Sequence, residues 1–452
     1  MKGPATPAAT YDIGTLLDTA RAGGYQRWLV FLTATTIVFD GIDNQLLGVV
    51  IPTVMNEWGV ARSAFAPVLS LGYAGMMVGG ALAGLAGDRF GRRRALLASV
   101  AAFGATTLAT AAVQDLTTLA VLRFVAGIGL GGALPNAATL AAEFVPRGQR
   151  PMAVTATIVC VPLGAMLAGI LGSQLLATTG WRALFVAGGV IPLVAAVVLT
   201  RLLPESPRFL ARHPERWPEL ERLTGKLGRP VPPGSSFEDS SDGQPRRSRR
   251  EGGSLFAAEF RRDTIALWCS FCSCLLAVYL GFSWLPTVLA GAGFGPGVAS
   301  NGITAFNLGG VVGALASGAV MSRIGSRAAM LTMNVGAIAG AVTLSMMTIS
   351  PAAPLAPIMI MLTITGGLIN AIQTTMYALA TNVYPSAVRA TGVGAATAVG
   401  RTGAIISGYA GPWALSFHAS ASYFALIAGA MVVCFVALAS VRRHVARSAG
   451  RA

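Results

Sequence analysis

Twelve long apolar stretches run through this chain, and they limit its possible folds more than any other feature. An apolar run of about 20 residues is long enough to cross a bilayer as a helix. The runs lie at roughly 28–54, 65–87, 95–114, 117–144, 152–177, 182–203, 263–289, 298–321, 328–349, 354–380, 391–413 and 420–441. Charged residues make up only 11% of the chain, whereas a soluble domain usually carries about 25%. The pattern predicts an all-α polytopic membrane protein with twelve transmembrane helices.

Arginine is distributed unevenly between the two sides of the predicted membrane. The short loops on one side carry Arg89, Arg92, Arg93, Arg94, Arg147, Arg150, Arg323, Arg327 and Arg389. The loops on the other side carry only Arg62 and Arg182. Positive residues collect in the cytoplasmic loops of membrane proteins, which explains the net charge of +15 without a nucleic-acid partner. We therefore expect the arginine-rich side and both termini to be cytoplasmic, with the protein in the cell (inner) membrane.

A long polar stretch separates the first six apolar runs from the last six. It includes "GRPVPPGSSFEDSSDGQPRRSRR", whose composition favours disorder. The predicted organisation is a cytoplasmic N-terminal segment at 1–27, a six-helix bundle at 28–203 and a partly disordered cytoplasmic linker at 204–262. A second six-helix bundle at 263–441 and a cytoplasmic tail at 442–452 follow.

The two predicted bundles repeat one another. The sequence "GALAGLAGDRFGRRRAL" after the second run is echoed by "GALASGAVMSRIGSRAAM" after the eighth, with Arg89 matching Arg323. The sequence "EFVPRGQR" after the fourth run is echoed by "NVYPSAVR" after the tenth, with Pro146 matching Pro385. A six-plus-six parallel repeat is typical of transporters whose halves rock about a substrate held at the membrane midplane.

Four charged residues lie deep inside the apolar runs, namely Asp40, Asp43, Arg123 and Arg401. Each costs about 2.5–3.5 kcal/mol at the bilayer centre, so such residues usually face a cavity and are paired. Asp40 and Asp43 are three residues apart and share a helix face with Asn44. One interpretation is a structural network of ion pairs. The other is a proton site on the carboxylates beside an anion site on the arginines, because a guanidinium can hold a substrate carboxylate.

The loop "GDRFGRRR" resembles the signature loop of the major facilitator superfamily. The matching positions are Gly84, Asp88, Arg89, Gly91, Arg92 and Arg93. The second copy keeps Arg323 but has Ser322 in place of the aspartate. The resemblance implies that this loop, together with Arg389, gates the inward-facing opening. The alternative is an anchoring loop without a gating role.

Three further segments are similar to the aromatic acid:proton symporter family within that superfamily. They are "FDGIDNQLLGVVIP", "RFVAGIGLGGALPNAATLAAEFVP" and "YPSAVRATGVGAATAVGRTGA". The family's charged positions fall on Asp40, Asp43, Asp88, Arg123, Glu143, Arg389 and Arg401. The resemblance implies proton-coupled uptake of small aromatic carboxylates of the hydroxybenzoate or phenylpropionate type, with Glu143 joining the two aspartates in proton coupling.

Polar and aromatic residues elsewhere in the runs are candidates for lining the cavity. We assign Arg123, Arg401, Asn44, Gln373, Tyr377 and Trp284 to substrate binding. The glycines at 127, 129, 131 and 132 are expected to bring neighbouring helices into close contact. The C-x-x-C at Cys269 and Cys272 lies in an apolar run, where small buried side chains are the favoured interpretation.

Alternative functions remain open on sequence grounds. "LPESPRFL" resembles a segment of sugar porters, so a porter for a sugar or another small metabolite, or a drug exporter, is the alternative. Two buried arginines suit an anion better than a neutral polyol. The three histidines lie far apart in the sequence and outside the apolar runs. We therefore expect no enzyme activity, no metal and no cofactor, and we expect a monomer in the lipid bilayer whose partners are an organic acid and protons.

Overall fold

The computed structural model describes residues 10–18, 22–239, 255–257, 259–384, 389–418 and 420–444, except for the side chains of 389 and 390. Within these residues, twelve helices of 19 or more residues account for every predicted run. The first six are α2 (Gly24–Trp58), α3 (Ala66–Phe90), α4 (Arg92–Thr110), α5 (Leu116–Phe144), α6 (Arg150–Leu175) and α7 (Trp181–Leu202). The last six are α11 (Arg261–Gly291), α12 (Pro296–Ile324), α13 (Ser326–Met346), α14 (Leu355–Val383), α15 (Arg389–His418) and α16 (Ser420–Ser440).

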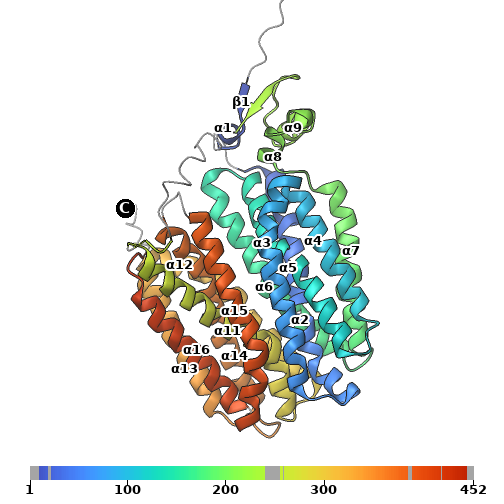
Figure 1. Ribbon diagram of the computed structural model, residues 1–452, viewed down its shortest axis with the longest axis vertical. Coiled ribbons are helices and arrows are strands. Elements are labelled where there is room, and N and C mark those ends of the chain that lie inside the picture. Colours follow the sequence, from blue (N-terminus) through green and yellow to red (C-terminus); the bar gives the residue numbers. More distant parts are fainter. Residues whose placement is uncertain are drawn as a thin grey trace, which may run out of the picture.

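The helices form two bundles that stand side by side, α2–α7 on the right and α11–α16 on the left of Figure 1. Among the described helices, ten are long and apolar enough to cross a membrane by composition alone. The exceptions are α4, which begins with three consecutive arginines, and α15. Both take their places as full-length members of their bundles (Figure 1), so the prediction of twelve helices is confirmed.

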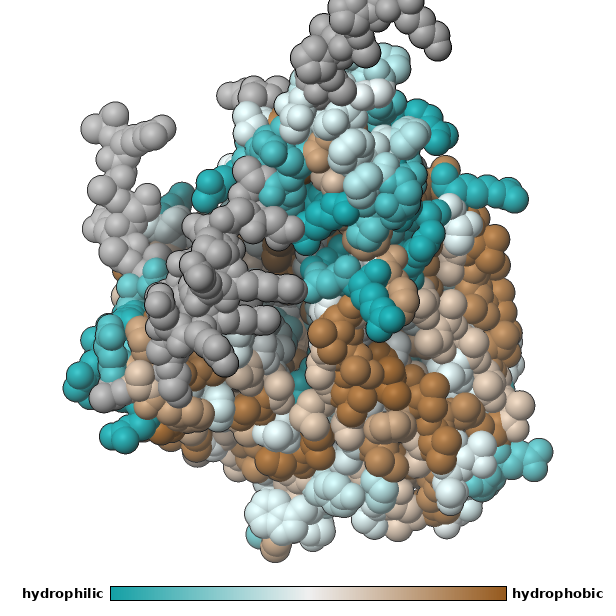
Figure 2. Space-filling model, turned by 45° about the horizontal axis from the view of Figure 1, so that its top comes forward, coloured by the Kyte–Doolittle hydropathy of each residue, from teal (hydrophilic) through white to brown (hydrophobic). Residues whose placement is uncertain are grey.

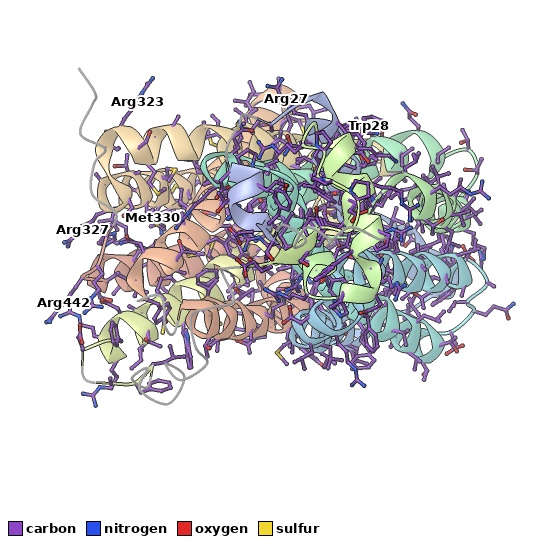
Figure 3. All side chains as sticks on the ribbon, turned by 90° about the horizontal axis from the view of Figure 1, so that it is seen from above. Arg27, Trp28, Arg323, Arg327, Met330 and Arg442 are labelled. Atoms are coloured by element: carbon purple, nitrogen blue, oxygen red, sulfur yellow. The ribbon has the colours of Figure 1, made fainter. Side chains whose placement is uncertain are left out.

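One end of the two bundles carries the arginine-rich loops, and we call it the arginine-rich end. Short turns lie between some helices: η1 (Arg62–Phe65) at the far end, and η2 (Arg147–Gln149) at the arginine-rich end. Seen from above that end, Arg323, Arg327 and Arg442 project from the margin of the second bundle (Figure 3). Figure 2 shows apolar side chains covering the flank below this polar end, as expected of a surface that faces hydrocarbon.

A small cap sits on the arginine-rich end of the first bundle (Figure 1). It combines β1 (Thr10–Asp12) and α1 (Ile13–Asp18) with α8 (Pro207–Ala211), η3 (Pro214–Arg216), α9 (Trp217–Lys226) and β2 (Ser236–Glu238). The two strands pair in parallel, with Tyr11 opposite Phe237. Ile13, Leu17, Leu210, Leu220 and Phe237 form a separate apolar core beneath them.

The first part of the predicted linker belongs to this cap. Residues 207–239 are largely structured, because Leu210, Leu220 and Phe237 find apolar partners on the N-terminal segment. The partners are 190 or more residues away in the sequence, so local composition gave no sign of them. The part of the predicted disorder that falls on 240–254 lies outside the described residues.

Glycines in α5 allow three helices to pack at backbone distance, as predicted. A Cβ atom on Gly127 would lie 2.1 Å from the Gly72 carbonyl oxygen of α3, and one on Gly131 would lie 2.1 Å from the Met76 carbonyl oxygen. The other face of α5 approaches α4, where a Cβ on Gly129 would lie 2.8 Å from the Ser99 carbonyl oxygen. No larger residue fits these positions without moving a helix.

The second bundle offers a matched test of this packing within a single helix. On α12, a Cβ on Gly313 would lie 2.1 Å from the Gly367 carbonyl oxygen, whereas nothing lies within 4 Å of one on Gly318. We expect Gly313→Leu to destabilise the fold by about 1–3 kcal/mol or more, the usual cost of overpacking. Gly318→Leu should leave stability near that of the wild type. Thermal unfolding of both variants in detergent measures the difference, and equal melting temperatures would contradict the packing described here.

Candidate functional site

A cavity lies between the two bundles, about halfway along the helices. Its volume is about 60 Å³, so the side chains of the two bundles lie close together around it. The first bundle lines it with Asp40, Asn44, Met76, Leu130, Leu134, Ile158, Val161 and Pro162. The second bundle lines it with Leu275, Val278, Tyr279, Phe282, Ala314, Asn370, Gln373, Thr374, Tyr377 and Arg401. The structure thus brings together five of the predicted site residues, Asp40, Asn44, Gln373, Tyr377 and Arg401, from three helices.

The cavity is closed at the end away from the arginine-rich loops. Tyr73 on α3 shares a hydrogen bond with Ser283 on α11, and the Gln45 side chain donates to the Phe282 carbonyl oxygen. The Ser70 hydroxyl donates to the Ile405 carbonyl oxygen at 2.8 Å. Among the described residues, every recorded hydrogen bond between the bundles lies in this half of the molecule. The hydrogen bonds therefore hold the bundles together on one side of the cavity only.

Asp40 and Arg401 carry the charge of the cavity, one from each bundle. Asp40 is only 5% exposed, and the two side chains are close enough to attract each other electrostatically. Asp40 Oδ1 and one terminal guanidinium nitrogen of Arg401 are buried and have no hydrogen-bond partner among the described residues. A buried polar atom without a partner is costly, so both atoms are poised to bind a group that enters the cavity.

Asp43 and Arg123 form a different kind of pair inside the first bundle. Arg123 Nη1 lies 3.5 Å from Asp43 Oδ2, and the Thr107 hydroxyl donates to the same carboxylate. The Arg123 guanidinium also donates to the Thr107 and Thr110 hydroxyls at 3.3 Å and lies over the Phe185 ring. Both charges are buried. Arg123 Nε has no hydrogen-bond partner among the described residues. The ion pair nevertheless favours the structural interpretation for Asp43 and Arg123.

The remaining walls of the cavity are aromatic and amide side chains. Tyr279 packs edge-on against Phe282, with ring centroids 5.8 Å apart, and also against Tyr73 at 4.5 Å. The side-chain amides of Asn44 and Gln373 have no recorded hydrogen bond with any described residue and face the cavity. An apolar slot with a few free polar groups is the usual form of a small-molecule site.

Trp284, which the sequence predicts to bind substrate, does not line this cavity. Its side chain is fully buried, and its indole nitrogen donates to the Ser407 carbonyl oxygen at 3.0 Å. Phe282, two residues earlier, lines the cavity. Because a helix has 3.6 residues per turn, side chains two residues apart point in nearly opposite directions. Trp284 therefore packs α11 against α15.

Glu143 lies away from the cavity at the arginine-rich end. It is nine residues beyond the cavity residue Leu134, which corresponds to about 14 Å along α5. The Ser206 hydroxyl donates to its carboxylate. Glu205, the residue before, is completely buried and accepts from the Arg93 backbone N–H at 2.9 Å. The sequence analysis does not predict these contacts of Glu205 and Ser206. The acidic residue in "LPESPRFL", directly after an apolar run, could have indicated them.

The signature loop packs on Glu205. Gly91 has φ +99°, a backbone conformation that favours glycine. A Cβ atom there would also lie 2.3 Å from the Glu205 carboxylate, so a larger residue would clash. Asp88 pairs with Arg92 one turn away, and the Arg93 guanidinium donates to the Thr200 carbonyl oxygen. Of the other predicted loop residues, Gly84 has open space around it and Arg89 lies over the Phe90 ring. The Arg389 side chain lies outside the described residues.

Comparison with known proteins places this geometry in a family. The Major Facilitator Superfamily profile matches residues 33–408. The chain is 34% identical to the gallate transporter of Pseudomonas putida, over 90% of each chain. It is 32% identical to the 4-hydroxybenzoate transporter PcaK of Acinetobacter baylyi, over 90% of this chain and 89% of the relative.

The solved structures agree in fold. The partially occluded inward-open conformation of the xylose transporter XylE from E. coli superposes with a TM-score of 0.73 at 16% identity, covering 92% of this chain and 97% of XylE. The profile match, the relatives and the shared twelve-helix architecture lead to one conclusion: this chain belongs to the major facilitator superfamily.

Proposed function

We propose that the protein carries hydroxylated aromatic carboxylates into the cell together with protons. The observation that carries this proposal is the cavity between the bundles. There a guanidinium nitrogen of Arg401 and a carboxylate oxygen of Asp40 are both buried and have no hydrogen-bond partner in the described part of the chain. An arginine fork matches a carboxylate, which is the charged group of the proposed substrate. A buried carboxylate beside it can take up and release a proton.

The walls of the cavity support an aromatic ring with hydroxyl substituents. Tyr279 and Phe282 present ring edges and faces of the kind that pack against another ring. The free amides of Asn44 and Gln373 can donate to and accept from a phenolic hydroxyl. The two relatives described above are named for gallate and 4-hydroxybenzoate, which are ring carboxylates with hydroxyl groups. A sugar offers no carboxylate for Arg401, so a sugar porter is the less favoured reading.

The arginine-rich end is proposed to face the cytoplasm, by the positive-inside rule. In that orientation, the hydrogen bonds of Tyr73, Gln45 and Ser70 close the cavity on its outer side. In the outward-facing state, a proton binds Asp40 and the substrate carboxylate binds Arg401. With both bound, the cavity carries little net charge, and the bundles can change position at low electrostatic cost. Proton and substrate leave on the cytoplasmic side.

The test is transport in proteoliposomes with a radiolabelled hydroxybenzoate. An inward proton gradient should drive accumulation by the wild type. Asp40→Asn should abolish accumulation but retain exchange of labelled for unlabelled substrate, because exchange needs no net proton movement. Asp115→Asn is the matched control: Asp115 caps α5, and hydrogen bonds from Thr118 hold the pKa of its carboxyl below its usual range. Asparagine is an equally good cap, so this variant should transport normally.

Two outcomes would contradict the proposal. Accumulation by Asp40→Asn that still follows the proton gradient would exclude Asp40 as the proton site. Uptake by the wild type that ignores an imposed gradient would exclude proton coupling altogether.

The closed side of the cavity gives a further prediction. Tyr73→Phe removes the hydrogen bond to Ser283, which is worth about 0.5–1.5 kcal/mol, and should raise the population opened on that side about 2- to 12-fold. Spin labels on Arg62→Cys and Gly295→Cys, one in each bundle, report this opening by distance measurement after the native cysteines are replaced. Tyr409→Phe, an exposed tyrosine on α15, is the control and should leave the distances unchanged.

A further inference from the structure

A second and larger hollow lies on the outer surface of the second bundle, away from the central cavity. We call it the lateral groove. Its floor is α11, and its two walls are α15 and α16. It has a volume of about 910 Å³, within the ~300–1,000 Å³ range of ordinary ligand sites. None of its lining residues belongs to the central cavity, so a role for the groove does not depend on the proposed transport function.

The groove opens toward the hydrocarbon of the membrane. Trp413 and Phe417 on α15 are 60% and 61% exposed, and Val433 on α16 is 55% exposed. Trp413 and Phe417 pack edge to face at 5.1 Å and form a continuous aromatic wall. On the floor, Cys269 is exposed between the walls, so the expectation of a buried side chain is wrong for this cysteine. Side chains of this kind at this depth meet lipid tails rather than solvent.

Water cannot fill this groove, because its middle offers almost no hydrogen-bonding groups. The Ser273 hydroxyl on the floor already donates to the Cys269 carbonyl oxygen at 2.7 Å. A cavity without polar partners stays dry, and an empty one forfeits dispersion contacts along its whole lining. An apolar chain is therefore the occupant that the lining favours.

The length and the ends of the groove indicate which apolar chain it takes. From Ser422 to Val433 it follows eleven residues of α16, or about 16 Å, which is half of the roughly 30 Å hydrocarbon layer. His418 and Ser422 lie at its end away from the arginine-rich loops, where the His418 backbone N–H donates to the Ser422 hydroxyl. The groove thus has one polar mouth at the membrane surface and an apolar interior one leaflet deep.

We propose that the lateral groove binds one acyl chain of a bilayer phospholipid, whose headgroup lies beside His418 and Ser422 in the leaflet opposite to the arginine-rich end. The driving force is packing of the chain against Trp413, Phe417 and the floor of α11, since lipid tails gain no hydrophobic energy by leaving the bilayer. The site is distinct from general lipid contact because three helices enclose the chain.

Substitution of Gly429 by a large residue can fill the groove and so test whether it binds a lipid chain. Nothing lies within 4 Å of a Cβ built on Gly429, so Gly429→Phe can occupy the groove without distorting α16. Ala425→Phe, one turn away on the same wall, is a second groove-filling variant. Gly318→Phe on α12 is the matched control, because this glycine is also exposed with open space around it but lies outside the groove.

The experiment uses the full chain, delipidated in detergent and titrated with a phosphatidylethanolamine that carries a diazirine near the end of one acyl chain. After illumination, peptide mass spectrometry locates the crosslinks, and native mass spectrometry counts the bound lipids. We expect saturable binding of one lipid, with crosslinks in α15, α16 and the floor of α11. Gly429→Phe and Ala425→Phe should lose this lipid, and Gly318→Phe should keep it.

The proposal fails if crosslinks spread evenly over all exposed helices, if labelling does not saturate, or if both groove-filling variants still bind the lipid as the wild type does. Monodisperse elution and an unchanged melting temperature identify the variants that are folded and hence informative.

Discussion

Arg401→Leu is expected to weaken binding of 4-hydroxybenzoate by about 10- to 100-fold, the largest effect on binding of any single change in the cavity. The loss corresponds to a hydrogen-bonded charge worth roughly 1.5–3 kcal/mol. Arg401→Lys should fall between the wild type and the leucine variant, because lysine keeps the charge but lacks the planar fork that matches a carboxylate. Titration of the purified protein with ligand, by calorimetry or equilibrium binding, measures all three affinities.

Arg323→Leu provides the control for loss of positive charge. Arg323 lies at the arginine-rich margin of the second bundle (Figure 3), far along α12 from the residues that line the cavity. Its replacement should leave the affinity unchanged. If Arg401→Leu binds the acid as tightly as the wild type, then Arg401 does not hold the carboxylate and the assignment of the anion site is wrong.

Arg123→Leu is expected to act on stability instead. It leaves Asp43 buried without its ion-pair partner, and breaking one side of a buried pair costs about 3–5 kcal/mol. The melting temperature of the detergent-solubilised protein should fall clearly. The double variant Arg123→Gln with Asp43→Asn should recover most of this loss, because neutral amides can still hydrogen-bond Thr107 and Thr110.

The same variants separate the two interpretations of the intramembrane charges. Asp40→Asn replaces a buried carboxylate whose Oδ1 has no hydrogen-bond partner among the described residues, and it should not lower the melting temperature. Should Arg123→Leu melt like the wild type but bind substrate weakly, Arg123 would be the anion site and the structural role would be wrong. A double variant no more stable than Arg123→Leu alone would show that the two residues do not act as a pair.

The sequence does not show that Asp40 lies beside Arg401 whereas Asp43 pairs with Arg123. Asp40 and Asp43 are three residues apart on one helix, and their spacing places them on a common face. Yet Asp40 borders the cavity beside Arg401, whereas Asp43 meets Arg123 and Thr107 inside the first bundle. The helix turns by 300° over three residues, so two neighbours on a broad face can contact different helices.

Trp284 and Glu143 also show that the sequence does not specify which residues a side chain contacts. Trp284 was chosen for its residue type within an apolar run, and Glu143 was chosen from the resemblance to the symporter family. Trp284 turns away from the cavity toward Ser407, and Glu143 lies near Ser206 at the arginine-rich end. The structured cap was missed because its core joins Ile13 and Leu17 to a linker some 200 residues away.

The sequence by itself determined the number of spans, their boundaries within a few residues, the repeat between halves and the presence of buried charge. These features follow from local physics: the bilayer demands apolar runs of a fixed length and penalises each unpaired charge within them. Only the tertiary structure decided which charges meet, which side of the cavity is closed and where α15 and α16 leave room for a lipid chain. Those outcomes depend on the rotation of each helix about its axis and on contacts between residues far apart in the chain, which no local pattern specifies.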